Sequence, residues 1–239
     1  MNLPRAAQPF ALLLAPILMW QGRRLKKRIP RLPEAAEPSG CVAGAAPAVR
    51  LAVFGDSTGA GVGADRHEEA LAGHLGTGIA RATGREVYWR AVARSGATSA
   101  TARDLVPRLA VSDWRPDVVI VVIGVNDLKN LRRLRDWKRD IAALLAAVRE
   151  TAAGAEVVVS GMAPVGRFPS LPQPLRWVMG LRARAMDHEL RRDPGFVPLD
   201  ASMARPELFG RDGFHPSSRG YQEWAEQLAG PVIRVIAGR

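Results

Sequence analysis

The sequence predicts an α/β fold, a three-layer α/β/α sandwich around a central, mostly parallel five-stranded sheet. Short apolar segments rich in β-branched residues alternate along the chain with longer segments of helical spacing. The strand segments are apolar on both faces, which is typical of parallel strands covered by helices on either side. Right-handed crossovers between such strands produce the three layers.

The first expected strand, 49–54, is a largely apolar run, and the third, 116–124, contains an unbroken run of six Val and Ile residues. Each is bounded by turn residues, as short buried strands are. The five expected strands are 49–54, 86–93, 116–124, 155–162 and 195–200. Because ligands of open α/β sheets bind at the carboxyl ends of the strands, the residues that follow these segments are the candidates for function.

Helical spacing is clearest in 134–152, and the segment 66–84 ends on a glycine, a common helix stop. Proline removes a backbone donor, so Pro107 and Pro231 are expected to break the helices that contain them. The five expected helices are 66–84, 99–110, 134–152, 174–192 and 217–237.

The chain has 239 residues, of which 47% are hydrophobic, enough for one core. Three parts are expected: an apolar and basic segment (1–29), a linker rich in Pro, Ala and Gly (30–48), and one folded domain (49–239). Of the net charge of +11, residues 1–33 carry +7, so the domain lacks the strong basicity of nucleic-acid-binding proteins. The single Cys41 and four scattered histidines give no disulfide and no metal-ligand set, and no cofactor is expected.

The N-terminal segment contains an apolar run, "PFALLLAPILMW" (9–20), followed at once by "QGRRLKKR". A spanning helix needs about 20 apolar residues. The favoured interpretation is an interfacial helix in which residues 9–31, including Trp20, lie on an anionic membrane surface. A short membrane anchor and a helix packed on the protein's own body are the alternatives. Positive charge after the apolar run disfavours a secretion signal and places the body in the cytoplasm, at the inner face of the membrane.

The stretch "VFGDSTGAGVGA" (53–64) follows the first strand and resembles a phosphate-binding loop. A dinucleotide site needs an acidic residue near the end of the second strand, and 90–97 contains none. A P-loop needs Lys followed by Ser or Thr, which is also missing. Nucleotide binding is therefore disfavoured, and Ser57 becomes a candidate nucleophile at the rim of the sheet.

Other chemistry-bearing residues follow the later strands. Gly96 comes after the second strand, Asn126 lies in "GVND" after the third, and Asp212 and His215 lie in "RDGFHPSS" before the last helix. All of these can meet with Ser57 over one edge of the sheet.

These blocks, "FGDS", Gly96, "GVND" and "DGFHP", resemble the SGNH hydrolases, also called the GDSL esterase and lipase family. The resemblance covers about 49–230 and is closest to the lysophospholipase-like esterases. It implies a flavodoxin-like sandwich with Ser57 as nucleophile, His215 as base and Asp212 as its partner. The N–H groups of Ser57 and Gly96 and the amide of Asn126 would form the oxyanion hole.

The chain departs from the family pattern at Arg94, where the family often has Asn. Asp56 is expected to brace the nucleophile loop rather than to react. The remaining histidines lie in helical stretches and are expected to be surface or core residues. They are His67, His74 and His188.

The expected function is hydrolysis of a carboxylic ester, with a lipid or lysophospholipid substrate favoured by the N-terminal segment. A carbohydrate or cell-wall O-acetyl esterase and a non-catalytic membrane-associated binding protein are the alternatives. The basic run 129–139 is interpreted as a solvated helix start, with contact to an anionic substrate or headgroup as the second interpretation. The loop 163–177 is expected to be either an acyl-group wall or lid, or a structural loop.

Overall fold

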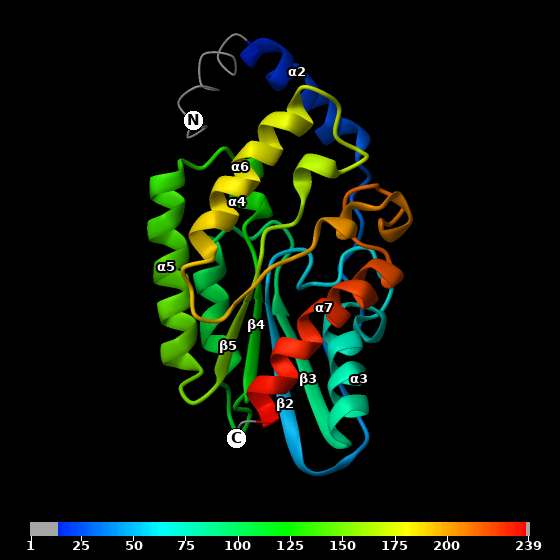
Figure 1. The fold of residues 1–239 in the computed structure, drawn as a ribbon, viewed down its shortest axis with the longest axis vertical. Helices are drawn as coiled ribbons and strands as arrows, with labels where there is room; N and C mark the ends of the chain where they lie inside the picture. Colours follow the sequence, from blue (N-terminus) through cyan, green and yellow to red (C-terminus); the bar gives the residue numbers. More distant parts are fainter. Residues whose placement is uncertain (1–13, 238–239) are drawn as a thin grey trace.

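The computed structural model describes residues 14–237, which contain one six-stranded sheet covered by helices on both faces (Figure 1). Its strand order is β1-β3-β2-β4-β5-β6, with β1 antiparallel to β3 and all other pairs parallel. The strands are β1 (Ser39–Val42), β2 (Ala45–Gly55), β3 (Arg85–Ala93), β4 (Val118–Val122), β5 (Glu156–Ser160) and β6 (Phe196–Val197). The expected sandwich is confirmed, but the sheet has a sixth strand at its edge.

Helices α3 and α7 cover one face of the sheet, and η3, α5 and α6 cover the other (Figure 1). The α-helices are α2 (Ala15–Arg28), α3 (Leu71–Thr83), α4 (Val125–Lys129), α5 (Leu134–Thr151), α6 (Leu175–Leu190) and α7 (Ser218–Ala237). Short 3-10 helices are η2 (His67–Glu69), η3 (Thr101–Leu109), η4 (Val165–Arg167), η5 (Ala201–Ala204) and η6 (Pro206–Leu208).

Strand β2 shows why the strand segments are apolar throughout. Leu51 and Val53 pack into the core beneath α3 and α7, whereas Ala52 and Phe54 pack into the core on the opposite face. All four side chains are fully buried. Burial of each large apolar side chain stabilises the fold by roughly 1.5–3 kcal/mol, so both layers depend on this strand.

The segment 30–48 is not the linker that its composition predicts. Its second half forms β1 and the start of β2, and Ala36 pairs with Arg66 in an isolated bridge. Pro47 lies where the register between β2 and β3 shifts, at a bulge that needs no N–H from this residue. Gly40 leaves room for the Trp89 ring, which would collide with a side chain there. The small residues of the segment 30–48 therefore allow close packing and do not make it a flexible linker.

Three helical segments also differ from expectation. Residues 101–109 form a 3-10 helix that includes Pro107, and the short helix α4 follows β4 directly. Helix α7 continues through Pro231 without a break. Leu228 and Val232 on either side of this proline are fully buried in the core, and this packing outweighs the lost backbone hydrogen bond.

Helix α2 packs on the body of the protein, the third of the interpretations of the N-terminal segment. The Gln21 side chain donates to the carbonyl of Gln173 (2.6 Å) and accepts from the N–H of Leu175 (3.1 Å). Leu25 and Ile29 pack against the main core. The beginning of the apolar run lies outside the described residues.

Residues 14–237 contain no helix that combines the length and the apolar character needed to cross a bilayer.

We predict that Gln21→Ala destabilises the fold, because two backbone groups lose their partner at a buried contact. The free energy of unfolding should fall by about 1–3 kcal/mol. Arg23→Ala, on the exposed side of the same helix, should change it by less than about 0.5 kcal/mol. Urea unfolding of both variants at pH 7 measures the difference. Equal stability of the two variants would contradict the docking of α2.

Candidate active site

Ser57 lies directly after β2, in a tight loop that turns back over the carboxyl edge of the sheet. Asp56 is buried and holds this loop: its Oδ1 accepts from the N–H (3.0 Å) and the hydroxyl (2.7 Å) of Thr58. Its backbone carbonyl accepts from the N–H of Ala60 (2.9 Å). Burial raises the pKa of Asp56, while the hydrogen bonds from Thr58 act in the opposite direction. The contacts of Asp56 are those expected of a loop brace.

The Ser57 hydroxyl meets a histidine from a distant part of the chain. His215 Nε2 lies 2.9 Å from Ser57 Oγ, and His215 Nδ1 lies 2.6 Å from Asp212 Oδ2. The second oxygen of Asp212 accepts from the backbone N–H groups of Phe214 and His215, both at 2.9 Å. These bonds fold residues 212–215 into a turn that aims the imidazole at the serine.

Burial works to raise the pKa of Asp212, but the hydrogen bonds from the His215 ring and backbone and from the Phe214 N–H outweigh it. The net effect lowers the pKa of Asp212 below its ordinary value. The carboxylate is therefore ionised at neutral pH and accepts from Nδ1–H. This tautomer leaves Nε2 free to accept a proton from Ser57.

The serine loop and the histidine segment are in close backbone contact. At Gly63, where φ is +107°, a side chain would collide with the carbonyl of Pro216. The Tyr221 hydroxyl from α7 donates to the carbonyl of Val62 (2.8 Å). The last glycine of the loop therefore serves the approach of the two segments and not a phosphate.

Gly96 lies in the loop after β3, and Asn126 lies in the short helix α4 after β4, at the same edge of the sheet. Asn126 Nδ2 donates to the carbonyl of Ala97 (2.9 Å), which links α4 to the loop after β3. The N–H of Arg94 donates to the carbonyl of Gly55 (3.2 Å), next to the serine loop. Gly96 has φ of +82° and open space around its Cα, so its backbone conformation explains the glycine.

Two donors near the serine have no protein acceptor. Within residues 14–237, the backbone N–H groups of Ser57 and Gly96 donate to no protein atom. One hydrogen of the Asn126 amide is also left over after the bond to Ala97. Ser57, His215 and Asp212 thus form one hydrogen-bonded series, whereas Asn126 bonds to Ala97, the chain neighbour of Gly96, and not to Gly96 itself.

Arg94, where the sequence departs from the family pattern, is turned to the surface. Its guanidinium donates to the carbonyl of Thr101 (3.0 Å) and lies 3.9 Å from Asp104. The residue therefore fastens η3 to the loop that carries Gly96.

Sequence reasoning missed two residues that hold these loops. Glu34 accepts from the N–H of Ser95 (2.6 Å), beside Gly96. Asp127 is buried and accepts from both the N–H (2.8 Å) and the hydroxyl (3.0 Å) of Ser99. Glu34 lies in the segment 30–48, which was predicted to be a linker, so no local pattern pointed to it. Asp127 lies inside "GVND", and this position was a signal that could have been used.

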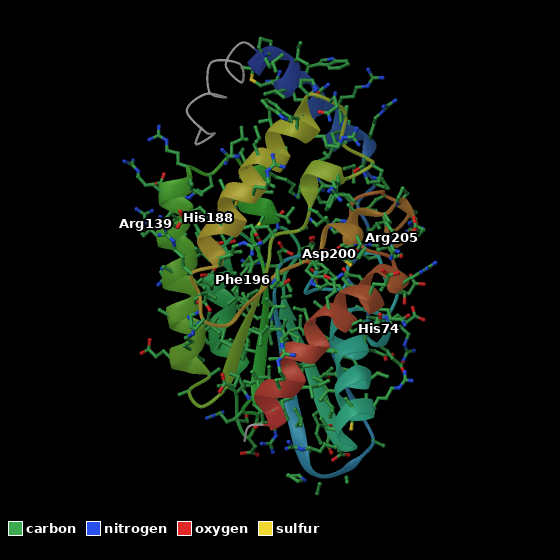
Figure 2. The ribbon with its side chains drawn as sticks, in the orientation of Figure 1. His74, Arg139, His188, Phe196, Asp200 and Arg205 are labelled. Atoms are coloured by element: carbon green, nitrogen blue, oxygen red, sulfur yellow. The ribbon has the colours of Figure 1, made fainter. Side chains whose placement is uncertain are left out.

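The other histidines lie elsewhere. His67 is buried in η2, where burial lowers its pKa, and His188 is exposed on α6 (Figure 2). His74 on α3 lies 3.4 Å from the Ser218 hydroxyl (Figure 2). Residues 14–237 hold no group of three or more His, Cys, Asp or Glu side chains that could bind a metal ion.

An apolar cavity of ≈ 50 Å³ opens beside Ser57 and His215. Phe168, Phe209 and Phe214 form an edge-to-face cluster in its wall, with ring centroids 4.9 and 5.4 Å apart. The loop 163–177 contributes Phe168 to this wall and also to the main core. The loop therefore lines the cavity and is also part of the core; its role as an acyl-group wall or lid stays a prediction.

The chain is similar to known ester hydrolases over most of its length. Residues 53–223 match the model of the GDSL-like Lipase/Acylhydrolase family. A GDSL-like esterase of Mycobacterium tuberculosis is 32% identical over 191 residues, which are 75% of this chain and 60% of that protein. The alpha1 subunit of human platelet-activating factor acetylhydrolase IB is 30% identical over 129 residues, 52% of this chain and 54% of that subunit. The chain thus spans between half and two thirds of these relatives.

Two solved structures share the fold. TesA superposes with a TM-score of 0.58 at 20% identity, over 78% of this chain and 99% of that one. The lipase Lip_vut3 from a goat rumen metagenome gives a TM-score of 0.58 at 20% identity, over 77% and 97% of the two chains. The family match covers well over half of the sequence, including Ser57 and His215, and the chain belongs to the GDSL-like lipase/acylhydrolase family of ester hydrolases.

Proposed function

We propose that this protein is a serine esterase that hydrolyses a carboxylic ester through an acyl-enzyme on Ser57. The observation that carries the proposal is the hydrogen-bonded series from Ser57 Oγ through the His215 ring to Asp212. This arrangement, at the mouth of an apolar cavity, is the one that acyl transfer requires.

In the first step, Ser57 Oγ attacks the carbonyl carbon of the ester while His215 Nε2 takes the hydroxyl proton. The tetrahedral intermediate then expels the alcohol, which receives that proton from His215. In the second step, a water molecule attacks the carbonyl carbon of the acyl-enzyme while His215 Nε2 takes one of its protons. The bond to Ser57 Oγ then breaks, the acid leaves, and Ser57 regains its proton from His215. The ionised Asp212 stabilises the imidazolium in both steps.

The negative oxygen of the intermediate needs hydrogen-bond donors. The unused N–H groups of Ser57 and Gly96 and the free amide hydrogen of Asn126 support this role. One such donor is typically worth about 3–4 kcal/mol in the transition state. Glu34, through Ser95, would hold the N–H of Gly96 in position.

The size of the cavity supports a short acyl group. A cavity of ≈ 50 Å³ accommodates a few water-sized groups, roughly an acyl chain of two to four carbons. A relative whose name specifies an acetylhydrolase is consistent with such a substrate.

The alcohol part of the substrate would reach the rim of the site, close to α2. Ile17, Met19 and Trp20 on this helix are 47–57% exposed, and Trp177 on α6 is 42% exposed. These side chains, together with the basic residues of α2, support contact with an anionic lipid surface and hence a lipidic ester.

We predict that Ser57→Ala and His215→Ala each reduce kcat for p-nitrophenyl acetate by about 10⁴-fold or more. The reason is that each removes a group that forms or breaks a bond in the reaction. His188→Ala, at an exposed histidine, is the control and should keep wild-type turnover. Spectrophotometric assay at pH 7.5 measures all three variants, with thermal unfolding to check the fold. Substantial turnover by a folded Ser57→Ala protein would refute the proposed mechanism.

We also predict a preference for short acyl chains. Wild-type kcat/KM should be at least tenfold higher for p-nitrophenyl acetate than for the octanoate, because the cavity of ≈ 50 Å³, with the phenylalanine cluster in its wall, is too small for an eight-carbon chain. Phe209→Ala should shift the preference toward longer chains. Phe196→Ala, which removes a ring of the same size on β6 (Figure 2), should not shift it. A wild-type enzyme that prefers the octanoate would contradict this assignment of the cavity.

A further inference from the structure

Asp56 is a buried acidic residue that the proposed mechanism does not use. It is 2% exposed, precedes the nucleophile in the chain, and lines the active-site cavity together with Ser57 and His215. Moving an ionised carboxylate out of water costs free energy unless other groups compensate for the lost solvation. The structure must therefore offer a reason for an acid at this position.

Bracing the serine loop does not require a charge. Only one oxygen of Asp56 holds the loop, since Oδ1 accepts both hydrogen bonds from Thr58. The carbonyl oxygen of an asparagine side chain could accept the same two bonds without burying a charge. The brace therefore explains the shape of the Asp56 side chain but not its acidity.

The second carboxylate oxygen of Asp56 has no hydrogen-bond partner. Within residues 14–237, no donor bonds to Oδ2. This oxygen is not sealed inside the protein either, because the fully buried side-chain atoms that lack a partner in this part of the chain belong to other residues. Oδ2 therefore keeps access to the cavity that Asp56 lines, and its charge acts there with little screening by solvent.

Two positively charged groups act on Asp56. Burial raises the pKa of Asp56, the hydrogen bonds from Thr58 lower it, and the charges of Lys129 and protonated His215 lower it as well. The Lys129 ammonium, on α4, lies 5.3 Å from the centre of a phenylalanine ring in the cavity wall. Tyr221 on α7 is neutral beside Asp56, because burial raises the pKa of its hydroxyl well above the ordinary value.

The influence of two charges on each other is mutual. A positive charge on His215 favours the ionised form of Asp56, so an ionised Asp56 favours a positive charge on His215 to the same degree. His215 gains this charge during the reaction, when Nε2 takes the proton of Ser57. Fixed charges in a small apolar cavity are effective at this moment, because they need no reorganisation of solvent.

We propose that Asp56 is a second carboxylate that acts through His215 and stabilises the imidazolium formed when Ser57 attacks the ester. Asp212 holds the ring on the Nδ1 side, by a hydrogen bond of 2.6 Å, whereas Asp56 acts from the side of the nucleophile. Asp56 is thus a positioning residue, since it influences the reacting atoms only through His215. This role rests on the proposed esterase function and is additional to the brace.

The test is a double-mutant cycle between Asp56 and His215, with p-nitrophenyl acetate at pH 7.5. Asp56→Asn keeps an oxygen for Thr58 but removes the charge. Both reaction steps pass through the imidazolium, so kcat should fall about tenfold or more while KM stays within about twofold. In the His215→Ala background, where no imidazolium forms, Asp56→Asn should change the residual kcat by less than about twofold. A tenfold loss that persists without His215 would overturn the proposal.

Two controls separate the charge of Asp56 from the brace and from the net charge of the protein. Thr58→Val removes a donor to Oδ1 but keeps the carboxylate, so kcat should fall by less than about threefold. Asp113→Asn removes an exposed carboxylate before β4, at the opposite edge of the sheet, and should keep wild-type kcat. A loss in either control as large as that in Asp56→Asn would overturn the proposal, as would a fully active Asp56→Asn protein.

A titration tests the same interaction if Asp56→Asn does not fold. NMR of a Ser57→Ala protein with isotopically labelled carboxyl groups follows the ionisation of Asp56. Adding His215→Ala removes a positive charge that lowers the pKa of Asp56, so Asp56 should titrate at higher pH. An unchanged titration would overturn the proposal. Ser57-dependent hydrolysis of p-nitrophenyl acetate tests the esterase function independently, so failure of this inference leaves that function standing.

Discussion

The arrangement of the site depends on one close contact, between the loop after β2 and the segment that carries His215. The two segments are far apart in the sequence, and their side chains can share a proton only if the backbones meet. The missing side chain at Gly63 permits this approach, and the hydrogen bond from Tyr221 to Val62 ties α7 to the serine loop. The short distance from Ser57 to His215 follows from this contact.

The N-terminal part of the chain adds a second set of constraints. The segment around Ala35 and Ala36 lies against the serine loop, with hydrogen bonds to the carbonyls of Ala60 and Asp65. Glu34 reaches the loop that carries Gly96. Farther toward the N-terminus, residues of α2 line a cavity that Asp212 of the catalytic turn also lines. The apolar and basic N-terminal segment and the segment predicted to be a linker thus help to build both the site and its rim.

Much of the fold and of the candidate site could be predicted from the sequence, for physical reasons. The strands are apolar on both faces, so parallel pairing followed, and it brought Ser57, Asn126 and His215 to one edge of the sheet. The Asp212–His215 contact is local; the family resemblance implied it, and a separation of three residues allows it. The edge strand β1 was missed because an edge needs few β-branched residues and can be built from small ones packed under Trp89.

The position of helix α2 depends on long-range contacts that no local pattern encodes. The apolar and basic pattern of 9–31 was compatible with a membrane surface, an anchor or the body of the protein. The bonds from Gln21 to the backbone around Gln173 decide the position of the described part.

The central claim is that Ser57 is the nucleophile, and covalent labelling tests it most directly. The protein would be treated with a fluorophosphonate at neutral pH, digested with trypsin and mapped by mass spectrometry. The account predicts one adduct, on Ser57 in the tryptic peptide 51–66, where it is the only serine. An adduct on another residue, or none on the folded protein, would contradict the account.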